Sequence, residues 1–280
     1  MSSTTWFITG ASSGFGLSFA RYALSMGYNV VATARDPAKL AALQAEAPAQ
    51  VLTTALDVND TASILAAVEA ARARFGRIDV LINNAGYGIV GAVEETPDTE
   101  LRALMETNFF GAVAVTQAVL PLLRRQESGA IVNISSLGGQ LSFGGFSAYS
   151  ASKFALEGMS EALAQEVAPF GIKVLIVEPG AFRTGFAADS LKHMPIMDAY
   201  RDIVGATRSF ARAMNGTQEG DPDKAAAAIE TVLRADAAPL RLQLGADSME
   251  SIRAHAEQLL KDLKTWGAVA LSTRVDTGAS

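Results

Sequence analysis

The chain has 280 residues, of which 49% are hydrophobic and 19% are charged, a balance that excludes a disordered or fibrous protein. It has no cysteine, which excludes disulfides, thiolate metal sites and cysteine nucleophiles, and its two histidines, His193 and His255, are too far apart in sequence to suggest a metal site. The net charge of −6 argues against binding to nucleic-acid phosphates.

The sequence also gives an expectation about location. No basic stretch followed by a long apolar run stands at the start, and no run of 18 apolar residues occurs. We therefore expect no secretory signal, no transmembrane helix and a cytoplasmic protein.

Short runs rich in β-branched residues recur along the first part of the chain, with longer stretches at helical spacing between them. They are Trp6–Thr9, Asn29–Ala34, Val51–Leu56, Val80–Asn83, Ala130–Ser135 and Lys173–Val177. Buried strands that alternate with helices indicate βαβ units. With a further strand expected at Arg241–Leu244, the sequence predicts an α/β, doubly wound Rossmann fold with a central parallel sheet of about seven strands.

Two long helices follow from their spacing and their end signals. Thr96 and Pro97 predict the start of one, with the threonine as its cap and the proline in the first helical position, and its apolar face continues to Thr116. A second helix is expected from Ser147 to about Pro169.

The last third of the chain has a weaker pattern. We expect one or two short helices over an opening in the fold, as a substrate loop at about 182–220. A helix should begin at Asp221–Pro222, and a helical C-terminal extension should cover about 247–270, with a loose tail after Leu271. No proline- or glycine-rich linker is visible, so the sequence predicts a single domain over residues 1–280.

A glycine-rich turn follows the first expected strand. Glycine lets the backbone turn tightly and approach a pyrophosphate closely, and the next helix offers free N–H groups and a positive dipole end to that anion. A glycine triplet can also be an ordinary flexible turn. Its place at the start of a βαβ series favours dinucleotide binding, and the expected residues are Gly10, Ser12, Ser13, Gly14, Phe15 and Gly16.

With this turn, the sequence resembles the short-chain dehydrogenase/reductase family over about residues 5–245. The matching motifs are Thr9-Gly10-x-x-x-Gly14-x-Gly16, Asn83-Asn84-Ala85-Gly86, Asn108, Ser136 with Tyr149 and Lys153, and Pro179-Gly180 with Thr184. The stretch Ala32–Pro37 and the C-terminal extension resemble the branch similar to 17β-hydroxysteroid dehydrogenases.

The resemblance implies a nicotinamide-dependent oxidoreductase that acts on a CH–OH group, without a metal. It also implies a homodimer or homotetramer, with an interface formed by the helix from Pro97 and the helix that carries Tyr149. By the same resemblance, the nicotinamide side of the cofactor site comprises Asn84, Ala85, Gly86, Tyr149, Lys153, Pro179, Gly180, Phe182 and Thr184.

The end of the second expected strand bears on the choice of cofactor. NAD-specific enzymes hold the ribose 2′-hydroxyl there with an acidic side chain, and the corresponding residue here is Ala34. Arg35 follows it, and a guanidinium can pair with a 2′-phosphate in a bidentate way. The sequence therefore favours NADP(H) over NAD(H). The alternatives are that Arg35 is a plain surface charge, and that Asp36 competes for Arg35 or for the ribose.

Asp57 follows the third expected strand. The resemblance implies that it hydrogen-bonds the adenine amino group, together with the backbone of Val58. The alternative is a helix cap near Asn59 and Asp60.

Tyr149 and Lys153 are four residues apart in a predicted helix and therefore share a face. A nearby ammonium favours the phenolate and should lower the pKa of the tyrosine toward a useful acid–base range. An ordinary packed tyrosine beside a solvated lysine is the alternative for an isolated pair of this kind. Ser136 or its neighbour Ser135 could bind a substrate carbonyl, and the spacing to Tyr149 selects Ser136.

By resemblance, Asn108 holds a water molecule that links Lys153 to solvent. The expected substrate pocket is apolar and comprises Tyr87, Leu141, Phe143, Phe146, Phe186, Met194 and Met197, although several of these could be core residues. Together these features predict reversible hydride transfer between NADP(H) and a hydrophobic ketone or secondary alcohol, as in carbonyl reductases. An NAD-dependent alcohol dehydrogenase and a non-catalytic NADP-binding module are the alternatives.

Overall fold

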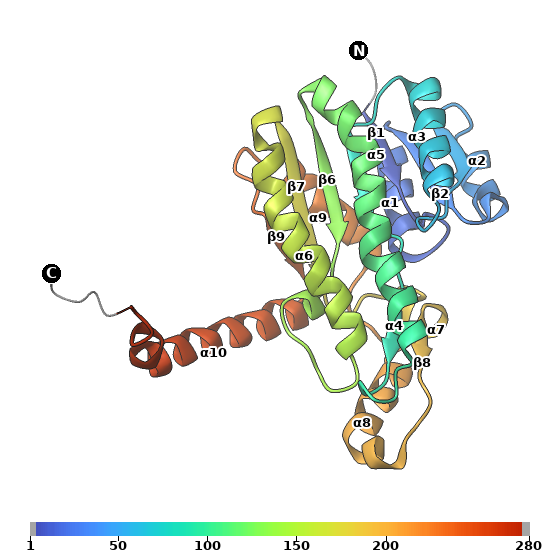
Figure 1. Ribbon diagram of the computed structural model, residues 1–280. Coiled ribbons are helices and arrows are strands. Elements are labelled where there is room, and N and C mark those ends of the chain that lie inside the picture. Colours follow the sequence, from blue (N-terminus) through green and yellow to red (C-terminus); the bar gives the residue numbers. More distant parts are fainter. Residues whose placement is uncertain (1–3, 276–280) are drawn as a thin grey trace, which may run out of the picture.

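A seven-stranded parallel sheet forms the centre of the computed structural model, which describes residues 4–275 (Figure 1). The strands are β1 (Thr5–Ile8), β2 (Asn29–Ala34), β3 (Val51–Ala55), β4 (Val80–Asn83), β6 (Gly129–Ile134), β7 (Ile172–Pro179) and β9 (Arg241–Leu244). Their order is β3-β2-β1-β4-β6-β7-β9, and every neighbouring pair is parallel. The predicted doubly wound α/β fold is confirmed.

Helices cover both faces of the sheet, and most residues of its strands are buried. In β1, Trp6 and Ile8 pack toward α1 and α9, whereas Phe7 packs toward α3, α5 and α6 on the other face. The bounds of these helices are α1 (Gly14–Ser25), α9 (Pro222–Arg234), α3 (Thr61–Phe75), α5 (Gly111–Gln126) and α6 (Ser147–Val167). A short helix, α2 (Ala41–Glu46), precedes β3.

The strand order reverses between β1 and β4. The chain passes from β1 to β2 on one side and later returns to β4 on the other side. In open parallel sheets, ligands bind beyond the carboxyl ends of the strands at such a point. The motifs of the sequence follow these strand ends, so the topology brings them to one edge of the sheet.

The segment at 182–220 contains α7 (Phe186–Asp189), β8 (Leu191–His193) and α8 (Arg201–Ala213). The expected short helices are present, but β8 was not expected. It pairs in parallel with β5 (Gly88–Val90), where Gly88 faces Leu191. A buried ion pair between Arg208 and Glu95, with 2.7 Å between Nη2 and Oε2, holds α8 to the segment after β5.

The predicted cap at Thr96 is wrong. The Thr96 hydroxyl donates to the carbonyl of Ala92 over 2.9 Å and is therefore used by the preceding turn. The helix α4 (Asp98–Met105) begins one residue later than expected, with Pro97 in the N-cap position. It continues through a π-helical turn, Glu106–Phe110, into α5.

The continuous helical stretch Asp98–Gln126 is long and apolar enough to cross a membrane by length and composition alone. Helices of the core of a folded domain have the same composition. Val115, Val119 and Leu123 are fully buried and pack in the apolar layer between the sheet and α3. These contacts are those of a core helix.

The last helix, α10 (Ala246–Leu271), begins beside the sheet and then projects away from the rest of the protein (Figure 1). It covers the expected extension at 247–270. After Leu271, Ser272 and Thr273 form a turn, and the rest of the expected tail, 276–280, lies outside the described residues.

Candidate active site

The turn between β1 and α1 has the backbone that an anion site requires. Gly10 and Gly14 have positive φ angles of 66° and 52°. A Cβ atom on Gly16 would lie 2.3 Å from the carbonyl oxygen of Gly10, so only glycine fits there. Ser13 precedes α1 and makes no side-chain cap. The first N–H groups of α1 are therefore available to a ligand.

This turn is tied to the end of β4. The Thr9 hydroxyl oxygen accepts from the backbone N–H groups of Asn84 and Ala85 over 2.9 and 3.0 Å. In return, the Asn84 side-chain amide donates to the carbonyls of Thr9 and Gly10 over 2.9 and 3.1 Å. The glycine turn and the Asn84-Ala85-Gly86 motif thus form one rigid wall.

A cavity of about 840 Å³ opens along this wall, at the carboxyl edge of the sheet. Its volume lies within the usual range for ligand pockets. Of the expected cofactor residues, those that line it are Gly10, Ser12, Ser13, Gly14, Phe15, Arg35, Asp57, Val58, Asn84, Ala85, Gly86, Tyr149, Lys153, Pro179, Gly180, Phe182 and Thr184. Gly16 does not line it and acts through the close packing of the turn.

Arg35 lies at one end of the cavity, at the end of β2. Its side chain is exposed and takes part in no ion pair with a described residue. Asp36, which the sequence left as a competitor, accepts the backbone N–H of Ala38 over 3.0 Å and caps the turn Pro37–Leu40. The guanidinium of Arg35 is thus available to a ligand in the cavity.

Asp57 also lines this end of the cavity. Its carboxylate accepts the N–H of Asn59 over 3.0 Å, whereas Asp60 caps α3 by accepting from Ala62. The alternative of Asp57 as the cap of this helix is therefore wrong.

Tyr149 and Ser136 both line the cavity. Tyr149 lies in the first turn of α6 and Ser136 follows β6, and their hydroxyls are hydrogen-bonded. The Ser136 hydroxyl also accepts the N–H of Gly138 over 3.1 Å, which fixes its position. Burial raises the pKa of Tyr149 to about 12, and the bond with Ser136 only partly opposes this. The expectation of a lowered pKa is wrong for this structure, because loss of solvent outweighs the favourable contacts.

Lys153 lies one turn further along α6 and is buried. Its ammonium donates to the carbonyl of Ile134 over 2.8 Å and lies 5.7 Å from the centre of the Tyr149 ring. Burial lowers the pKa of Lys153 to about 8, and the charge of Glu157 partly opposes this shift. The lysine is thus positioned by the backbone of β6, close to the tyrosine.

Asn108 lies in the π-helical turn, where π-bulges often mark functional sites. Its side-chain amide donates to the carbonyl of Tyr87 over 2.9 Å and to the hydroxyl of Ser152 over 3.0 Å, and its oxygen accepts the N–H of Tyr87 over 3.0 Å. A Cβ on Gly86 would lie 3.0 Å from that oxygen and 3.8 Å from the ammonium of Lys153. Asn108 is therefore buried behind the cavity wall, and only its oxygen has capacity left for a water molecule.

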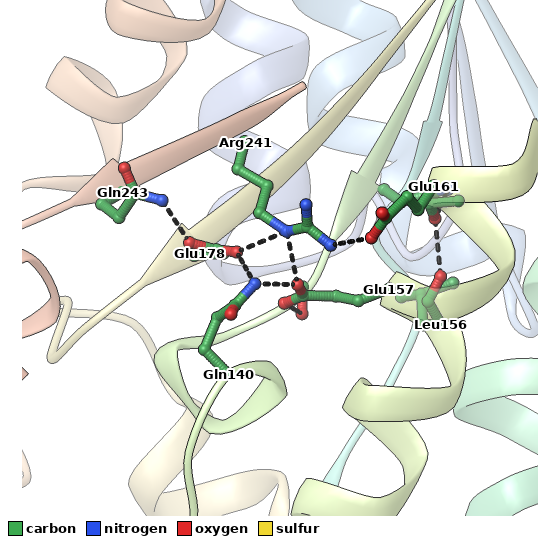
Figure 2. Close-up of polar contacts among 10 residues, drawn as sticks. Gln140, Leu156, Glu157, Glu161, Glu178, Arg241 and Gln243 are labelled. Carbon is green, nitrogen blue, oxygen red and sulfur yellow. Dashed lines mark hydrogen bonds and ion pairs between the residues drawn. The ribbon is translucent and has the colours of Figure 1, made fainter. Parts of the chain in front are cut away.

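A buried polar network lies behind Lys153, and the sequence did not predict it (Figure 2). The hydroxyl of Ser135 donates to Glu157 over 2.7 Å, so this hydroxyl belongs to the network although Ser135 also lines the cavity. Glu157 lies one turn after Lys153 on α6 and is joined to Glu178 of β7 by the side chain of Gln140. Arg241 of β9 provides the positive charge, with its Nε 3.0 Å from Glu157.

Another part of the cavity lining is aromatic, and the charged residues Lys192 and Asp189 also line the cavity. The expected residues Tyr87, Phe143, Phe146 and Phe186 belong to this aromatic part. The rings of Phe186 and Phe146 lie 5.7 and 6.4 Å from the ring of Tyr149, measured between centroids. The sequence missed further lining residues, among them Leu137, Leu191, Phe210 and Met214. The amphipathic pattern of α8 could have indicated Phe210.

Three of the expected pocket residues do not line the cavity. Met194 is buried in a separate apolar cluster with Leu104 and Ile89. Met197 is held by its backbone N–H, which donates to Glu95 over 2.9 Å. Leu141 lies beyond the turn after β6, and Leu137 of that turn lines the cavity instead.

Comparison with known proteins decides the family. The family model described as short chain dehydrogenase matches residues 4–195. The chain belongs to the short-chain dehydrogenase family. A crystal structure of a short-chain dehydrogenase from Streptomyces avermitilis is 47% identical, with a TM-score of 0.93 over 98% of this chain and 100% of that one.

Two curated relatives are oxidoreductases. Oxidoreductase BOA17 of Botryotinia fuckeliana is 42% identical over 269 residues, which cover 96% of this short-chain dehydrogenase and 98% of the relative. The 3-ketodihydrosphingosine reductase of Bacteroides thetaiotaomicron is 41% identical over 243 residues, 85% of this chain and 86% of the relative.

Related structures contain nicotinamide cofactors. A metagenomic short-chain oxidoreductase in complex with NADP is 28% identical (TM-score 0.68, 87% of this chain, 97% of that chain). The 3-ketoacyl-(acyl-carrier-protein) reductase of Brucella melitensis, complexed with NADH, is 27% identical (TM-score 0.72, 86% and 96%). The uncapped start of α1 and the close-packed glycine turn fit such a cofactor. The protein is therefore an oxidoreductase that uses a nicotinamide cofactor.

Proposed function

We propose that this short-chain dehydrogenase is an NADP(H)-dependent oxidoreductase that interconverts a hydrophobic ketone and its secondary alcohol, as carbonyl reductases do. One observation carries the proposal: the bonded hydroxyls of Tyr149 and Ser136 line the same cavity as the glycine turn, and the rings of Phe146 and Phe186 lie beside the ring of Tyr149. A cofactor on the glycine turn and a substrate against these rings would meet at these hydroxyls.

Each catalytic group then has one task. When bound, the cofactor supplies or accepts the hydride. Ser136 and Tyr149 hold the substrate oxygen, and Tyr149 exchanges the proton with it. The raised pKa of about 12 keeps the phenol protonated at neutral pH, as a donor to a ketone oxygen must be. Lys153 is cationic below its pKa of about 8 and stabilises negative charge that develops on the tyrosine.

The preference for NADP(H) rests on the end of β2. Arg35 lines the cavity, has no ion-pair partner among the described residues, and has the neutral Ala34 beside it. Arginine is well suited to bind a phosphate through paired hydrogen bonds. The 2′-phosphate of NADP(H) would be such a partner.

The substrate class follows from the aromatic part of the cavity. Tyr87, Phe143, Phe146 and Phe186 offer aromatic surface, and the ammonium of Lys192 lies 5.1 Å from the centre of the Tyr87 ring. The name of the Bacteroides relative, a 3-ketodihydrosphingosine reductase, supports a ketone on a long apolar chain. We accordingly propose an apolar substrate that carries one polar carbonyl or hydroxyl group.

Oxidation of NADPH and of NADH, followed by absorbance against a panel of aliphatic and aryl ketones, tests the proposal. Turnover should occur with NADPH and rise with the apolar size of the ketone. Tyr149→Phe should bind NADPH as the unmodified protein does, but lose turnover by ~10²–10⁴-fold, the usual contribution of general acid–base catalysis. Faster turnover with NADH would favour the NAD-dependent alternative. Cofactor binding without turnover of any ketone or alcohol would favour the non-catalytic module.

A further inference from the structure

The projecting helix α10 carries an apolar stripe that, beyond the partly buried Ile252 at its start, no other described part of the chain covers. Its residues recur at alternating intervals of four and three, which is the spacing of a coiled-coil seam. We name this set the α10 seam, and it comprises Ile252, Ala256, Leu259, Leu263, Trp266 and Ala270. From Ala256 to Leu271, every residue except Gly267 is exposed. Leu263 is 71% exposed and Trp266 is 65% exposed.

A helix in this position needs a partner. The start of α10 contacts β7, β9, the turn Leu137–Gly139 and Ala181, and the helix then extends away from the rest of the described chain (Figure 1). Most helical stability in proteins comes from packing of an apolar face rather than from helix propensity. Contiguous exposed apolar side chains on one face therefore indicate an interaction surface.

We propose that the α10 seam pairs with the same seam of a second copy of this chain, in antiparallel orientation about a two-fold axis near Lys261. In this arrangement Leu263 packs on the partner's Leu259, and Trp266 packs on the partner's Ala256. Ala270 packs on the partner's Ile252. Each large side chain thus meets a small or medium one, as close packing requires. A parallel pair would place Trp266 on the partner's Trp266 and leave a gap between two copies of Ala256.

The charges of α10 favour a second copy over a membrane surface. Helices that bind membranes have a polar face rich in lysine and arginine. Between its bounds, α10 carries four acidic and three basic side chains, namely Asp247, Glu250, Glu257 and Asp262, and Arg253, Lys261 and Lys264. The α10 seam is also separate from the helices that the family resemblance suggests as an interface, α4–α5 and α6.

The base of α10 connects this surface to the active site. The carboxylate of Asp247 accepts the N–H of Ala181 over 2.7 Å, and the hydroxyl of Ser248 donates to the carbonyl of Glu178 over 2.7 Å. Asp247 and Ser251 line the cavity. Pairing of the two helices would therefore hold one wall of each cavity in place.

Subunit number, measured by size-exclusion chromatography with multi-angle light scattering, tests the seam. Leu263→Glu combined with Trp266→Glu should give half the molar mass of the unmodified protein. The matched control, Ala254→Glu with Ala268→Glu, adds two carboxylates on the opposite face of α10 and should leave the mass unchanged. Circular dichroism and ketone turnover report that each variant is folded. A folded seam variant with unchanged mass would overturn the proposal, as would an unmodified protein that is monomeric at micromolar concentration.

Cross-linking tests the orientation, because the natural chain has no cysteine. Leu260 flanks the seam at the level of the proposed axis, so Leu260→Cys should form an intermolecular disulfide under mild oxidation. Ala270→Cys should not, because the two copies of residue 270 would lie ~27 Å apart along an antiparallel pair. The reverse pattern would overturn the antiparallel arrangement. The partner would be a membrane instead of a second copy if the unmodified protein were a monomer that sediments with phosphatidylcholine vesicles and the seam variant did not sediment with them.

Discussion

Glu157 of α6 and Glu178 of β7 share a single amide: Nε2 of Gln140 lies 2.6 Å from Oε2 of Glu157 and 2.9 Å from Oε1 of Glu178 (Figure 2). Both carboxyls are buried, and Arg241 also forms an ion pair with the exposed Glu161. Burial, and then the charge of Glu157, raise the pKa of Glu178 to about 7. The two carboxyls therefore compete for one proton near neutral pH.

We expect this proton to make stability depend on pH. The pKa of Glu178 is raised above its ordinary value of 4.5, so its contribution to stability is fully present below pH 4.5 and is lost as the pH rises through about 7. Urea unfolding at several values between pH 5 and 8 should show a loss on the order of 2–3 kcal/mol toward the alkaline side. Glu178→Gln should flatten this dependence.

Glu161→Gln is the control for this experiment, because Glu161 also pairs with Arg241 but is half exposed. It should keep the pH dependence of the unmodified protein. If the stability of Glu178→Gln changed with pH as steeply as that of Glu161→Gln, a group other than Glu178 would have to bind the proton.

The two neighbouring serines should separate catalysis from stability. Ser136→Ala removes a hydroxyl bonded to Tyr149 and should lower kcat/KM by ~10²–10³-fold, as loss of one donor to a developing oxyanion does. Ser135→Ala removes the hydroxyl that donates to Oε1 of the buried Glu157 and should cost ~1–3 kcal/mol of unfolding free energy, with a smaller effect on turnover. Steady-state kinetics and urea unfolding of both variants measure the two effects, and a larger kinetic loss in Ser135→Ala would exchange the two assignments.

Lys153 should set the alkaline limit of ketone reduction. Its pKa is lowered to about 8, whereas Tyr149 with a pKa of about 12 stays protonated, so kcat/KM should be level below pH 8 and fall above it. Glu157 raises the pKa of Lys153, and Glu157→Gln should therefore move this fall to lower pH. The pH profiles of kcat/KM for both proteins check the prediction. A fall that stays at the same pH in the variant would remove Glu157 from this role.

Local patterns in the sequence predicted the strands well because each buried strand is a short β-branched run between turns. The sequence also allowed the three residues proposed for catalysis to be placed near one another, since Tyr149 and Lys153 share one helix and Ser136 follows a strand. The sequence could not predict that Glu178 and Arg241 lie beside α6, because the pairing of β6 with β7 and of β7 with β9 brings them there. Only the interval of four residues between Lys153 and Glu157 gave a local signal for that network.

The apolar pocket was predicted less well, for a simple reason. A methionine in the core and a methionine on a cavity wall have the same local pattern, so Met194 and Met214 could not be told apart. The pairing of β5 with β8 and the direction of α10 depend on contacts between distant segments, which a single sequence does not display.

The proposed preference for NADP(H) depends on Arg35, and substitution of this residue gives the sharpest test of that proposal. Arg35→Ala should weaken NADPH binding about ten- to a hundredfold, since a hydrogen bond to a charged group contributes ~1.5–3 kcal/mol, and should leave NADH binding nearly unchanged. Lys39→Ala, which removes an exposed cation from the neighbouring turn outside the cavity, is the matched control and should alter the binding of neither cofactor.

Adding Ala34→Asp to Arg35→Ala supplies an acid for the free ribose hydroxyl and repels a 2′-phosphate, so the preference should then turn to NADH. Fluorescence titration of each variant with both cofactors measures these shifts. Equal losses for NADPH and NADH in Arg35→Ala would mean that the arginine acts through the fold or through general charge, and the end of β2 would then no longer support the choice of NADP(H).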